Sequence, residues 1–288
     1  ADAGSYTIAI VAGQVKDKAG NALAGNAAAA SFSVTADNAP VLDLNGVGGG
    51  TGNTVTLANA ANGLATAGAT ATDAELGALN AGAGNWNGAS LEVQRVKAGG
   101  ASDGSINDVY NFTSSGEFSV TGGSIVKGAD ANGSLTATTG GAQFATWSYT
   151  SATGKLVVTF DADASNSLVQ DVVQHIGYSN ATPYGTATIR MGLNDGNSTT
   201  HADVTVTSNT IYVDQTTYDA QNDAADGFNL AEALGKAVDG DTILIQDGTY
   251  RGQFVATTAV TIDAVNGAGH VTLEAPNTYD LVASSQVM

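Results

Sequence analysis

The sequence predicts an all-β protein in which β-sandwich modules in tandem are followed by the helix-capped start of a parallel β-helix. Three observations lead to this fold class. Turn-forming dipeptides are frequent, short segments between residues 54 and 208 alternate polar and apolar residues, and a capped amphipathic helix near residue 230 leads into regularly spaced apolar pairs. With 37 Gly, only 3 Pro and 12% charged residues, the composition argues against a disordered Pro-rich chain.

Ten dipeptides carry strong turn chemistry, because Asn-Gly and Asp-Gly tolerate the positive φ that tight hairpins require. Asn-Gly begins at Asn45, Asn62, Asn87, Asn132 and Asn266, and Asp-Gly begins at Asp103, Asp195, Asp226, Asp239 and Asp247. Turns at this spacing favour several units made of short strands.

Residues 1–38 predict a strand, a Gly/Asn loop and a second strand: SYTIAIVAGQV, KDKAGNALAGN and AASFSVTAD. Two or three strands cannot bury a two-sided core alone. The words AGQVKDKAGNALAGN and SFSV resemble the last hairpin of bacterial immunoglobulin-like domains that occur in tandem on surface proteins. We therefore expect the C-terminal part of such a sandwich here, or a unit that borrows strands from a neighbour.

Residues 39–208 predict a complete β-sandwich with one short helix. ADNAPVLDLNG reads as a linker that runs into a first strand, and eight further segments alternate in polarity. The segments are Thr54–Leu57, Leu91–Val96, Val109–Phe112, Glu117–Val120, Gln143–Tyr149, Lys155–Phe160, Thr186–Leu193 and Asp203–Ser208. The helix is expected over 166–176, capped by Asn166 and ended by Gly177, and would cover an open end of the sandwich.

The stretch from residue 154 to 207 reads GKLVVTFDADASNSLVQDVVQHIGYSNATPYGTATIRMGLNDGNSTTHADVTVT. A strand, a short helix, a Y-x-N turn at Tyr178–Asn180, a hairpin marked by Arg190 and Asp195–Gly196, and a closing strand at Val204–Val206 follow in this order. This order, with the opening PVLDLNG, resembles the cadherin-like and Ig-like repeats of giant bacterial adhesins. The resemblance spans about 165 residues and implies an extracellular, repetitive context.

Residues 209–288 predict a capping helix over 229–238 and the first rungs of a right-handed parallel β-helix. Asn229 and Glu232 have the spacing of a capping box, and Leu230, Leu234 and Val238 share one helical face. The apolar pairs Ile243/Ile245, Val260/Ile262 and Val271/Leu273 then recur with turns between them, as stacked coils of a solenoid do.

The words AEALGKAVDGDTILIQDGTYRG resemble the beginning of right-handed parallel β-helices of the pectate-lyase-like class. The first coil of a solenoid exposes an open sheet edge and the end of an apolar core, so an amphipathic helix before it would act as a lid. The alternative is a surface helix packed on the preceding sandwich. Because the first and third units both look incomplete, we expect the chain to be part of a longer polypeptide.

The net charge of −18 repels nucleic acid and anionic membranes, which argues against both as partners. Of the 27 acidic residues five are Glu, which leaves 22 Asp, and short carboxylates in Gly/Asn-rich loops suit Ca²⁺. There is no Cys, hence no disulfide, thiol catalysis or thiolate zinc site, and no apolar run is long enough for membrane insertion. We expect a secreted protein at a bacterial cell surface.

The resemblance to adhesin repeats implies Ca²⁺ at module junctions and carries over four candidate ligands: Asp43, Asp73, Glu75 and Asp195. Asp73 and Glu75 stand one residue apart, in D-x-E rather than the usual D-x-D order. The alternative for each is a solvated acid in a turn.

No catalytic motif is present, so no enzyme is expected within these residues. The favoured function is a structural segment of a giant extracellular surface protein (an adhesin, or a subunit of a sheath, filament or S-layer), whose modules Ca²⁺ makes rigid. Its partners would be neighbouring modules, copies of itself, and surface glycans.

Two alternatives stay open. One is a set of accessory modules and the cap of a β-helix polysaccharide lyase; the third unit offers only Lys236 and Arg251 as cations, and its active rungs would lie beyond residue 288. The other is a non-catalytic glycan-binding module, for which Trp86, Trp147 and Tyr149 could stack on sugars, although core positions suit these aromatic residues better.

Overall fold

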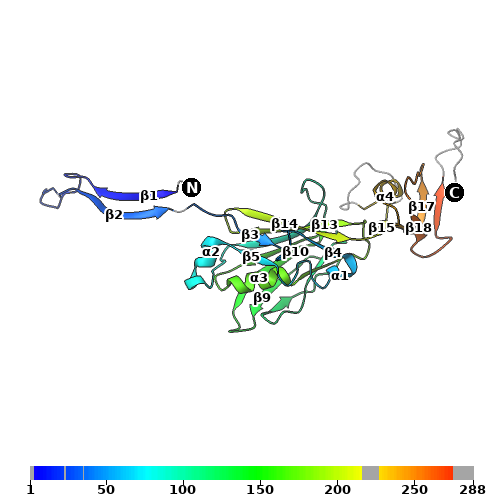
Figure 1. Cartoon of the computed structure of the whole chain (residues 1–288), viewed down its shortest axis with the longest axis horizontal. Coiled ribbons are helices and arrows are strands. Elements are labelled where there is room, and N and C mark those ends of the chain that lie inside the picture. Colours follow the sequence, from blue (N-terminus) through cyan, green and yellow to red (C-terminus); the bar gives the residue numbers. More distant parts are fainter. Residues whose placement is uncertain (1–2, 23, 35, 216–226, 275–288) are drawn as a thin grey trace. The chain divides into compact units, whose positions relative to one another are not determined.

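The computed structural model describes residues 3–22, 24–34, 36–215 and 227–274 (Figure 1). Strands make up 42% of the protein and helices 12%, which confirms the all-β class. Contacts divide the chain into two compact units, 1–39 and 40–288. Residues 216–226 and 275–288, which belong to the predicted third unit over 209–288, lie outside the described residues.

The first unit is a hairpin of two antiparallel strands, β1 (Gly4–Ile10) and β2 (Asn26–Val34). Tyr6 and Phe32 face each other across the ladder, with stacked rings 5.3 Å apart. Phe32 is nevertheless 52% exposed and Ile8 55% exposed. The strand–loop–strand order follows the sequence, and the described residues of the hairpin bury no core of their own.

The second unit contains the remaining elements. Its strands are β3 (Val41–Asp43), β4 (Asn53–Thr56), β5 (Thr70–Thr72), β6 (Ser90–Val96), β7 (Val109–Phe112), β8 (Phe118–Gly122), β9 (Ala131–Ala137), β10 (Gln143–Thr150), β11 (Lys155–Phe160), β12 (Ile176–Ser179), β13 (Ala187–Asn194), β14 (Thr199–Thr207), β15 (Thr210–Val213), β16 (Thr242–Ile245), β17 (Gly248–Arg251), β18 (Thr261–Ala264) and β19 (Val271–Glu274). Its helices are α1 (Leu57–Ala60), α2 (Ala74–Ala78), α3 (Asn166–Gln174) and α4 (Leu230–Lys236), with short 3₁₀ turns at Asn80–Gly82 and Ser151–Thr153.

A large sheet organises residues 40–208. Its strand order is β4-β14-β13-β6-β11-β10-β9-β8, and every pairing is antiparallel except that of β14 with β4. Strand β6 shows the alternation that makes the sheet two-sided: Leu91 and Val93 are fully buried, whereas Glu92 between them is half-buried.

The inward side chains of this sheet form one hydrophobic cluster with the two-stranded sheets β3–β5 and β7–β12 and with helix α3. Helix α3 contributes Leu168, Val169, Val172 and Val173, the apolar face that the sequence predicted. In Figure 1 the green α3 and the blue-to-cyan β3 and β5 overlie the long strands of the large sheet.

A second hydrophobic cluster lies in the helix-capped part. Strands β15, β16 and β18 pair in parallel, with Ile211 beside Ile243 and Ile243 beside Ile262, and β17 pairs in parallel with β19. Helix α4 packs Leu230 and Leu234 into the same cluster as the side chains of β15 and β16. The capping box is confirmed, because Asn229 Oδ1 accepts from the Glu232 amide and Glu232 Oε2 accepts from the Asn229 amide.

Several local predictions were wrong at the ends of elements. Ser165, not Asn166, caps α3, and α3 ends at Gln174, so that Gly177 lies inside β12. A Cβ on Gly177 would meet the Ala61 carbonyl oxygen at 2.4 Å, so close backbone approach explains this glycine. Helix α4 ends at Lys236, and Val238 beyond it is 62% exposed rather than buried.

Strand β9 was missed because Asn132–Gly133 reads as a turn. In the structure both residues lie within the strand, and Gly133 makes room first for the Thr121 carbonyl oxygen of β8 and then for Trp147, whose Nε1 would lie 2.7 Å from an added Cβ. Ile262 and Leu273 were expected to be buried but are 48% and 50% exposed. Among the described residues, no strand pairs with the far edge of β18 or β19 to cover them.

Candidate functional site

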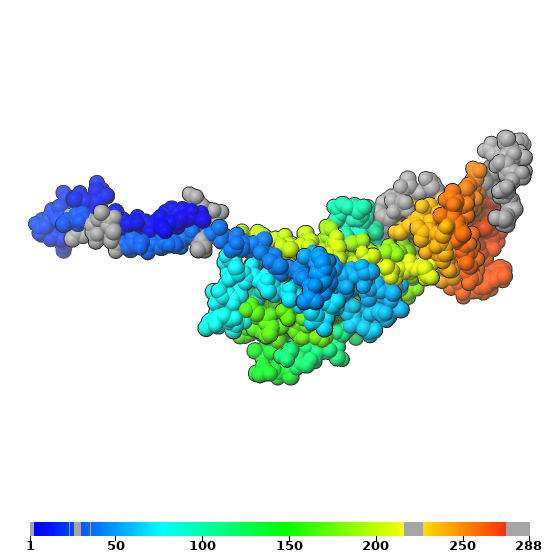
Figure 2. Space-filling view, viewed as in Figure 1, coloured from blue at the N-terminus to red at the C-terminus, as the bar shows by residue number. Residues whose placement is uncertain are grey.

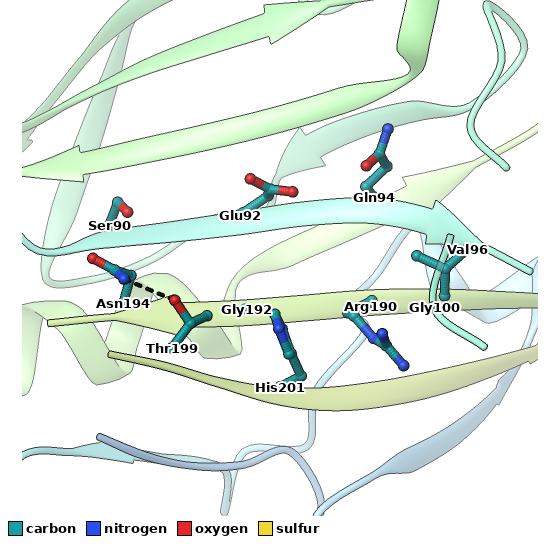
Figure 3. A pocket seen from close by; sticks show the side chains of 10 residues that line it. All are labelled: Ser90, Glu92, Gln94, Val96, Gly100, Arg190, Gly192, Asn194, Thr199 and His201. Carbon is teal, nitrogen blue, oxygen red and sulfur yellow. Dashed lines mark hydrogen bonds between the residues drawn. The ribbon is translucent and has the colours of Figure 1, made fainter. Parts of the chain in front are cut away.

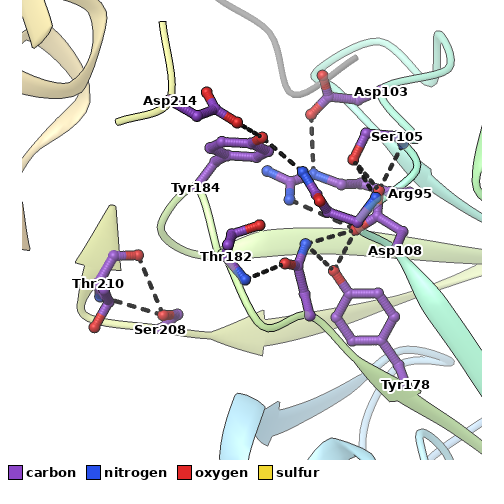
Figure 4. A network of polar contacts seen from close by, with 12 residues as sticks. Arg95, Asp103, Ser105, Asp108, Tyr178, Thr182, Tyr184, Ser208, Thr210 and Asp214 are labelled. Carbon is purple, nitrogen blue, oxygen red and sulfur yellow. Dashed lines mark hydrogen bonds and ion pairs between the residues drawn. The ribbon is translucent and has the colours of Figure 1, made fainter. Parts of the chain in front are cut away.

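Tyr184 belongs to the second hydrophobic cluster and contacts Asn107 and Arg95 of the large-sheet part, and the side chains around this residue are called the joint below. The predicted module boundary at residues 208/209 would place Tyr184 in the sandwich, yet its ring belongs to the second cluster. Its hydroxyl donates to Asp214 Oδ2 at 2.8 Å and accepts from Asn107 Nδ2 at 2.7 Å (Figure 4). One hydroxyl thus links a loop of the large-sheet part to the segment after β15.

A column of rings and cations runs through the joint. The Arg95 guanidinium carbon lies 5.7 Å from the centroid of the Tyr184 ring, which stacks on the Phe228 ring at 4.9 Å. The Lys236 ammonium lies 5.1 Å from the centroid of the Phe228 ring. Cation–π contacts are strongest when they are desolvated, and here Arg95, Tyr184 and Phe228 are each at most 1% exposed.

The charge of Arg95 is compensated inside the protein. Its Nε lies 3.1 Å from Asp103 Oδ2 and its Nη1 3.9 Å from Asp108 Oδ1. Asp108 has no exposed surface, so an unpaired charge there would be costly. Burial lowers the pKa of Lys236, and the positive charge of Arg95 lowers it further.

Asp108 gathers further donors from distant parts of the chain. Oδ1 accepts from the Tyr178 hydroxyl at 2.5 Å and from Asn180 Nδ2 at 3.1 Å, and Oδ2 accepts from the Ser105 amide at 2.8 Å. Burial, followed by the neighbouring Asp108 charge, raises the pKa of the Tyr178 hydroxyl far above its ordinary value, so it stays a donor. Figure 4 shows Ser105 and Tyr178 reaching Asp108 from opposite sides.

Sequence analysis missed this network, although one signal was available. Leu91, Val93 and Arg95 occupy successive inward positions of the alternation in β6, so the third position places a cation where the sheet buries its side chains. A charge at such a position requires a partner, and Asp103 and Asp108 follow within the next loop.

The predicted metal ligands Asp73, Glu75 and Asp195 are electrostatic neighbours, and this group is called the acid corner below. Asp73 caps α2: its Oδ1 accepts from the amides of Glu75 and Leu76. Its Oδ2 is buried and has no hydrogen-bond partner within the described residues. Burial first, and then the charges of Asp195 and Glu75, raise the pKa of Asp73.

Both carboxylate oxygens of Asp195 accept hydrogen bonds within the turn of the β13–β14 hairpin. Oδ1 accepts from the amides of Asn197 and Ser198, both at 2.7 Å, and Oδ2 accepts from the Ser198 hydroxyl. Burial acts to raise the pKa of Asp195, but these hydrogen bonds outweigh it and lower the pKa. The negative charge of Asp195 therefore persists beside Asp73.

Asp43 is not brought together with the other three candidates. It pairs with Thr70, whereas Asp73 follows Thr72 at the opposite end of the same strand pair. Its Oδ1 accepts from the amides of Asn45 and Gly46, which holds a local turn. Across the described residues, no three His, Asp or Glu side chains converge as a ready-made metal site.

The cations and aromatic residues considered for the alternative functions are engaged in contacts within the protein or are buried. Lys236 belongs to the joint, and Arg251 Nε lies 2.6 Å from Glu274 Oε2 across β17 and β19. Trp86, Trp147 and Tyr149 are at most 3% exposed, so none presents a ring face for sugar stacking. Within the described residues, no helix is long and apolar enough to cross a membrane.

The comparisons with known proteins identify no relative. No protein-family model matches the chain, and no curated protein or solved structure matches it either. The geometry of the joint and of the acid corner therefore has to carry the functional argument by itself.

Proposed function

We propose that this chain is a structural segment of a long extracellular protein on a bacterial surface, either an adhesin or a subunit of a self-assembling sheath, filament or S-layer. The observation that carries the proposal is the joint. The buried side chains of Arg95, Tyr184 and Phe228 fix the helix-capped part against the large-sheet part through a desolvated stack, and the exposed Lys236 lies beside the Phe228 ring. A segment that bears load needs such a connection, and catalysis does not.

Two finer fold assignments belong to this proposal. The first is a β-sandwich over 39–208, supported by the apolar cluster that the large antiparallel sheet shares with the small sheets β3–β5 and β7–β12. The second is the start of a parallel β-helix from residue 209, supported by the in-register parallel ladder Ile211–Ile243–Ile262. Helix α4 would then be the lid of the first coil, because its buried face packs on β15 and β16.

The joint would remove hinge freedom between these two modules. A connection made of one flexible loop leaves modules free to reorient, whereas a large, desolvated contact does not. In the space-filling view the yellow atoms of the large sheet pass into the orange atoms of the helix-capped part without a gap (Figure 2). A stiff pair of modules would extend whatever lies beyond them away from the cell.

Calcium forms a second part of the proposal, and Asp73 is the residue that supports it. Its Oδ2 is buried without a hydrogen-bond partner among the described residues, and the negative charges of Asp195 and Glu75 act on it. A hard cation such as Ca²⁺ would bind an oxygen of this kind. A bound Ca²⁺ would place positive charge beside the carboxylates of Asp73 and Asp195. Asp43 stays a prediction of the family resemblance, because the structure joins it to none of the other three.

The proposed location at the cell surface and the proposed partners follow from the same structural role. Neighbouring modules of the same polypeptide, further copies of the chain and surface glycans are the proposed partners. A net charge of −18 disfavours nucleic acid and anionic membranes.

The test is exposure on living cells. Antibodies raised against the full chain should label intact, unpermeabilised cells of the bacterium that encodes it, and external protease should remove the label. An antibody against a cytoplasmic protein serves as the control for intact envelopes. Labelling that appears only after permeabilisation would rule out a surface scaffold.

A further inference from the structure

The outer face of the large sheet carries a polar hollow of about 360 Å³, called the groove below (Figure 3). Its side chains come from three adjacent strands, β6, β13 and β14, and the loop at Gly100 borders one end. Because the backbone ladders of a central sheet hold these positions, the floor is rigid. This volume lies in the range typical of small-molecule sites, about 300–1,000 Å³.

Gly192 creates the groove. It occupies an outward position of β13 between Arg190 and Asn194, so the strand has no side chain where its neighbours carry long ones. Glycine weakens a central strand, and in such a position it commonly marks close approach of another group. Here the ring of His201 lies over it: an added Cβ would come within 2.8 Å of the imidazole Nδ1.

The groove presents unused hydrogen-bonding groups of both kinds. Gln94 uses its amide nitrogen for Ser102 and the Thr153 carbonyl, which leaves its side-chain carbonyl oxygen as an acceptor. Arg190 uses Nε and Nη2 for Asp203, which leaves Nη1 as a donor. The ring of His201 makes no hydrogen bond to any residue that the structure describes. Figure 3 shows these side chains on neighbouring strands along one face.

The charges at the groove are already compensated. Arg190 forms two 2.8 Å contacts with Asp203, and Glu92 Oε2 lies 2.5 Å from the Lys155 ammonium. A paired guanidinium in a chain of net charge −18 gives little attraction for an anion. The lining is also too polar for an apolar ligand, and no metal-binding triad exists within the described residues.

We propose that the groove binds the end of a neutral glycan. Sugar hydroxyls donate and accept at once, so they match a surface on which carbonyl, guanidinium and imidazole groups alternate. Because no Phe, Tyr or Trp ring among the described residues lines the groove for a sugar to stack on, a single site should bind weakly, with a dissociation constant on the order of 1 mM. Several copies displayed together would raise the avidity by roughly 10²–10⁴. This site rests on the proposed function, in which surface glycans are partners, but a groove that binds no glycan would leave the scaffold role to be tested by surface labelling.

The experiment uses the full chain, biotinylated and displayed as tetramers on streptavidin, against a printed array of neutral and sialylated glycans. The neutral glycan that binds best is then titrated into the ¹⁵N-labelled chain up to about 50 mM, well above the expected dissociation constant. Saturable shifts are expected at the backbone amides of Glu92, Gly192 and His201.

Two variants locate the site. Gly192→Ala adds a methyl group to the floor and displaces the ring of His201, and Gln94→Ala removes an acceptor; each should weaken binding about tenfold or more. Thr159→Ala, on the exposed side of neighbouring strand β11, is the matched control and should bind as the wild type does. The proposal is overturned if no neutral glycan binds, if only sialylated glycans bind, or if both groove variants bind with unchanged affinity.

Discussion

The joint and the acid corner both hold buried or half-buried carboxylates, but they treat the negative charge in opposite ways. At the joint, Asp103 and Asp108 share the buried cation Arg95, and Asp108 accepts hydrogen bonds from Tyr178, Asn180 and Ser105. At the acid corner, Asp73 Oδ2 has no partner within the described residues, and the nearby charges that act on it are negative.

This difference separates two ways of making a connection stiff. A region whose carboxylates are paired with a cation of the protein needs no ion or proton from solution, so its stability changes mainly when a residue is substituted. A region with uncompensated negative charge gains stability when a proton or a cation arrives. We therefore expect the joint to respond to substitution and the acid corner to respond to solution conditions.

Substitution of Arg95 should have the largest effect. Arg95→Met keeps much of the apolar stem but leaves Asp108 charged and buried without its cation, which costs about 3–5 kcal/mol in comparable sites. The free energy of unfolding of the full chain, measured by denaturant titration, should fall by this amount.

The control for this variant is Arg251→Met, because Arg251 is also paired with a carboxylate but its side chain is 75% exposed. Exposed pairs contribute less than about 1 kcal/mol, so this variant should stay close to the wild type. Equal effects of the two substitutions would show that the buried pair has no special part in the joint.

Substitution of Tyr184 tests the hydrogen bonds of the joint separately from its ring stack. Tyr184→Phe retains the contact with Phe228 but leaves Asn107 Nδ2 and Asp214 Oδ2 without the shared hydroxyl. Loss of a partner from a buried polar group costs about 1–3 kcal/mol, and denaturant unfolding should show this decrease.

Tyr212→Phe provides the matched control in adjacent strand β15, because the Tyr212 hydroxyl makes no hydrogen bond within the described part of the chain. Its removal should change the free energy of unfolding by less than about 0.5 kcal/mol. If Tyr184→Phe is as mild as this control, the hydroxyl does not hold the two clusters together.

Sequence patterns predicted the elements whose side chains alternate regularly, and they failed where a glycine or a polar residue serves a distant neighbour. Strands β7 and β11 begin and end where alternation placed them, and the capping box of Asn229 and Glu232 is local enough to be read directly. Strand β9 was missed because Gly133 makes room for groups on other strands, including Trp147. Contacts between residues far apart in the chain leave no local sequence pattern.

The candidate site divides in the same way. The carboxylates of the acid corner were named from the chain, because acids in Gly/Asn-rich loops are visible in sequence. That Asp73 and Asp195 are neighbours while Asp43 lies apart depends on strand pairing and could not be read from spacing. Tyr184 precedes the predicted boundary at 208/209 but packs in the second hydrophobic cluster, and no local pattern encodes this position.

Protonation of Asp73 should stabilise the folded chain in mild acid, whereas the lowered pKa of Asp195 gives a contribution that is lost only as the pH falls through that lowered value. Because the pKa of Asp73 is higher in the folded chain than its ordinary value of 3.8, the folded state holds this proton more tightly than the unfolded state does. The contribution of protonated Asp73 is present at low pH and is lost as pH rises through the folded pKa.

Asp73→Asn isolates the contribution of the Asp73 charge to stability, since asparagine can still accept hydrogen bonds from the amides of Glu75 and Leu76 but carries no charge. The melting temperature of the variant should exceed that of the wild type at pH 7 in a chelator, and the advantage should shrink toward pH 4. A variant that melts below the wild type at neutral pH would contradict the raised pKa.

Calcium should give the smallest effect and the most specific one. In the wild type, Ca²⁺ added after chelation should raise the melting temperature, because the cation satisfies Asp73 Oδ2 and offsets the charges of Glu75 and Asp195. In Asp73→Asn the same addition should leave the melting temperature nearly unchanged, whereas Asp43→Asn should respond as the wild type does, because Asp43 lies at the other end of its strand pair. A calcium response that survives in Asp73→Asn would move the ion away from the acid corner, and a wild type indifferent to calcium would leave the joint as the only source of stiffness proposed for this chain.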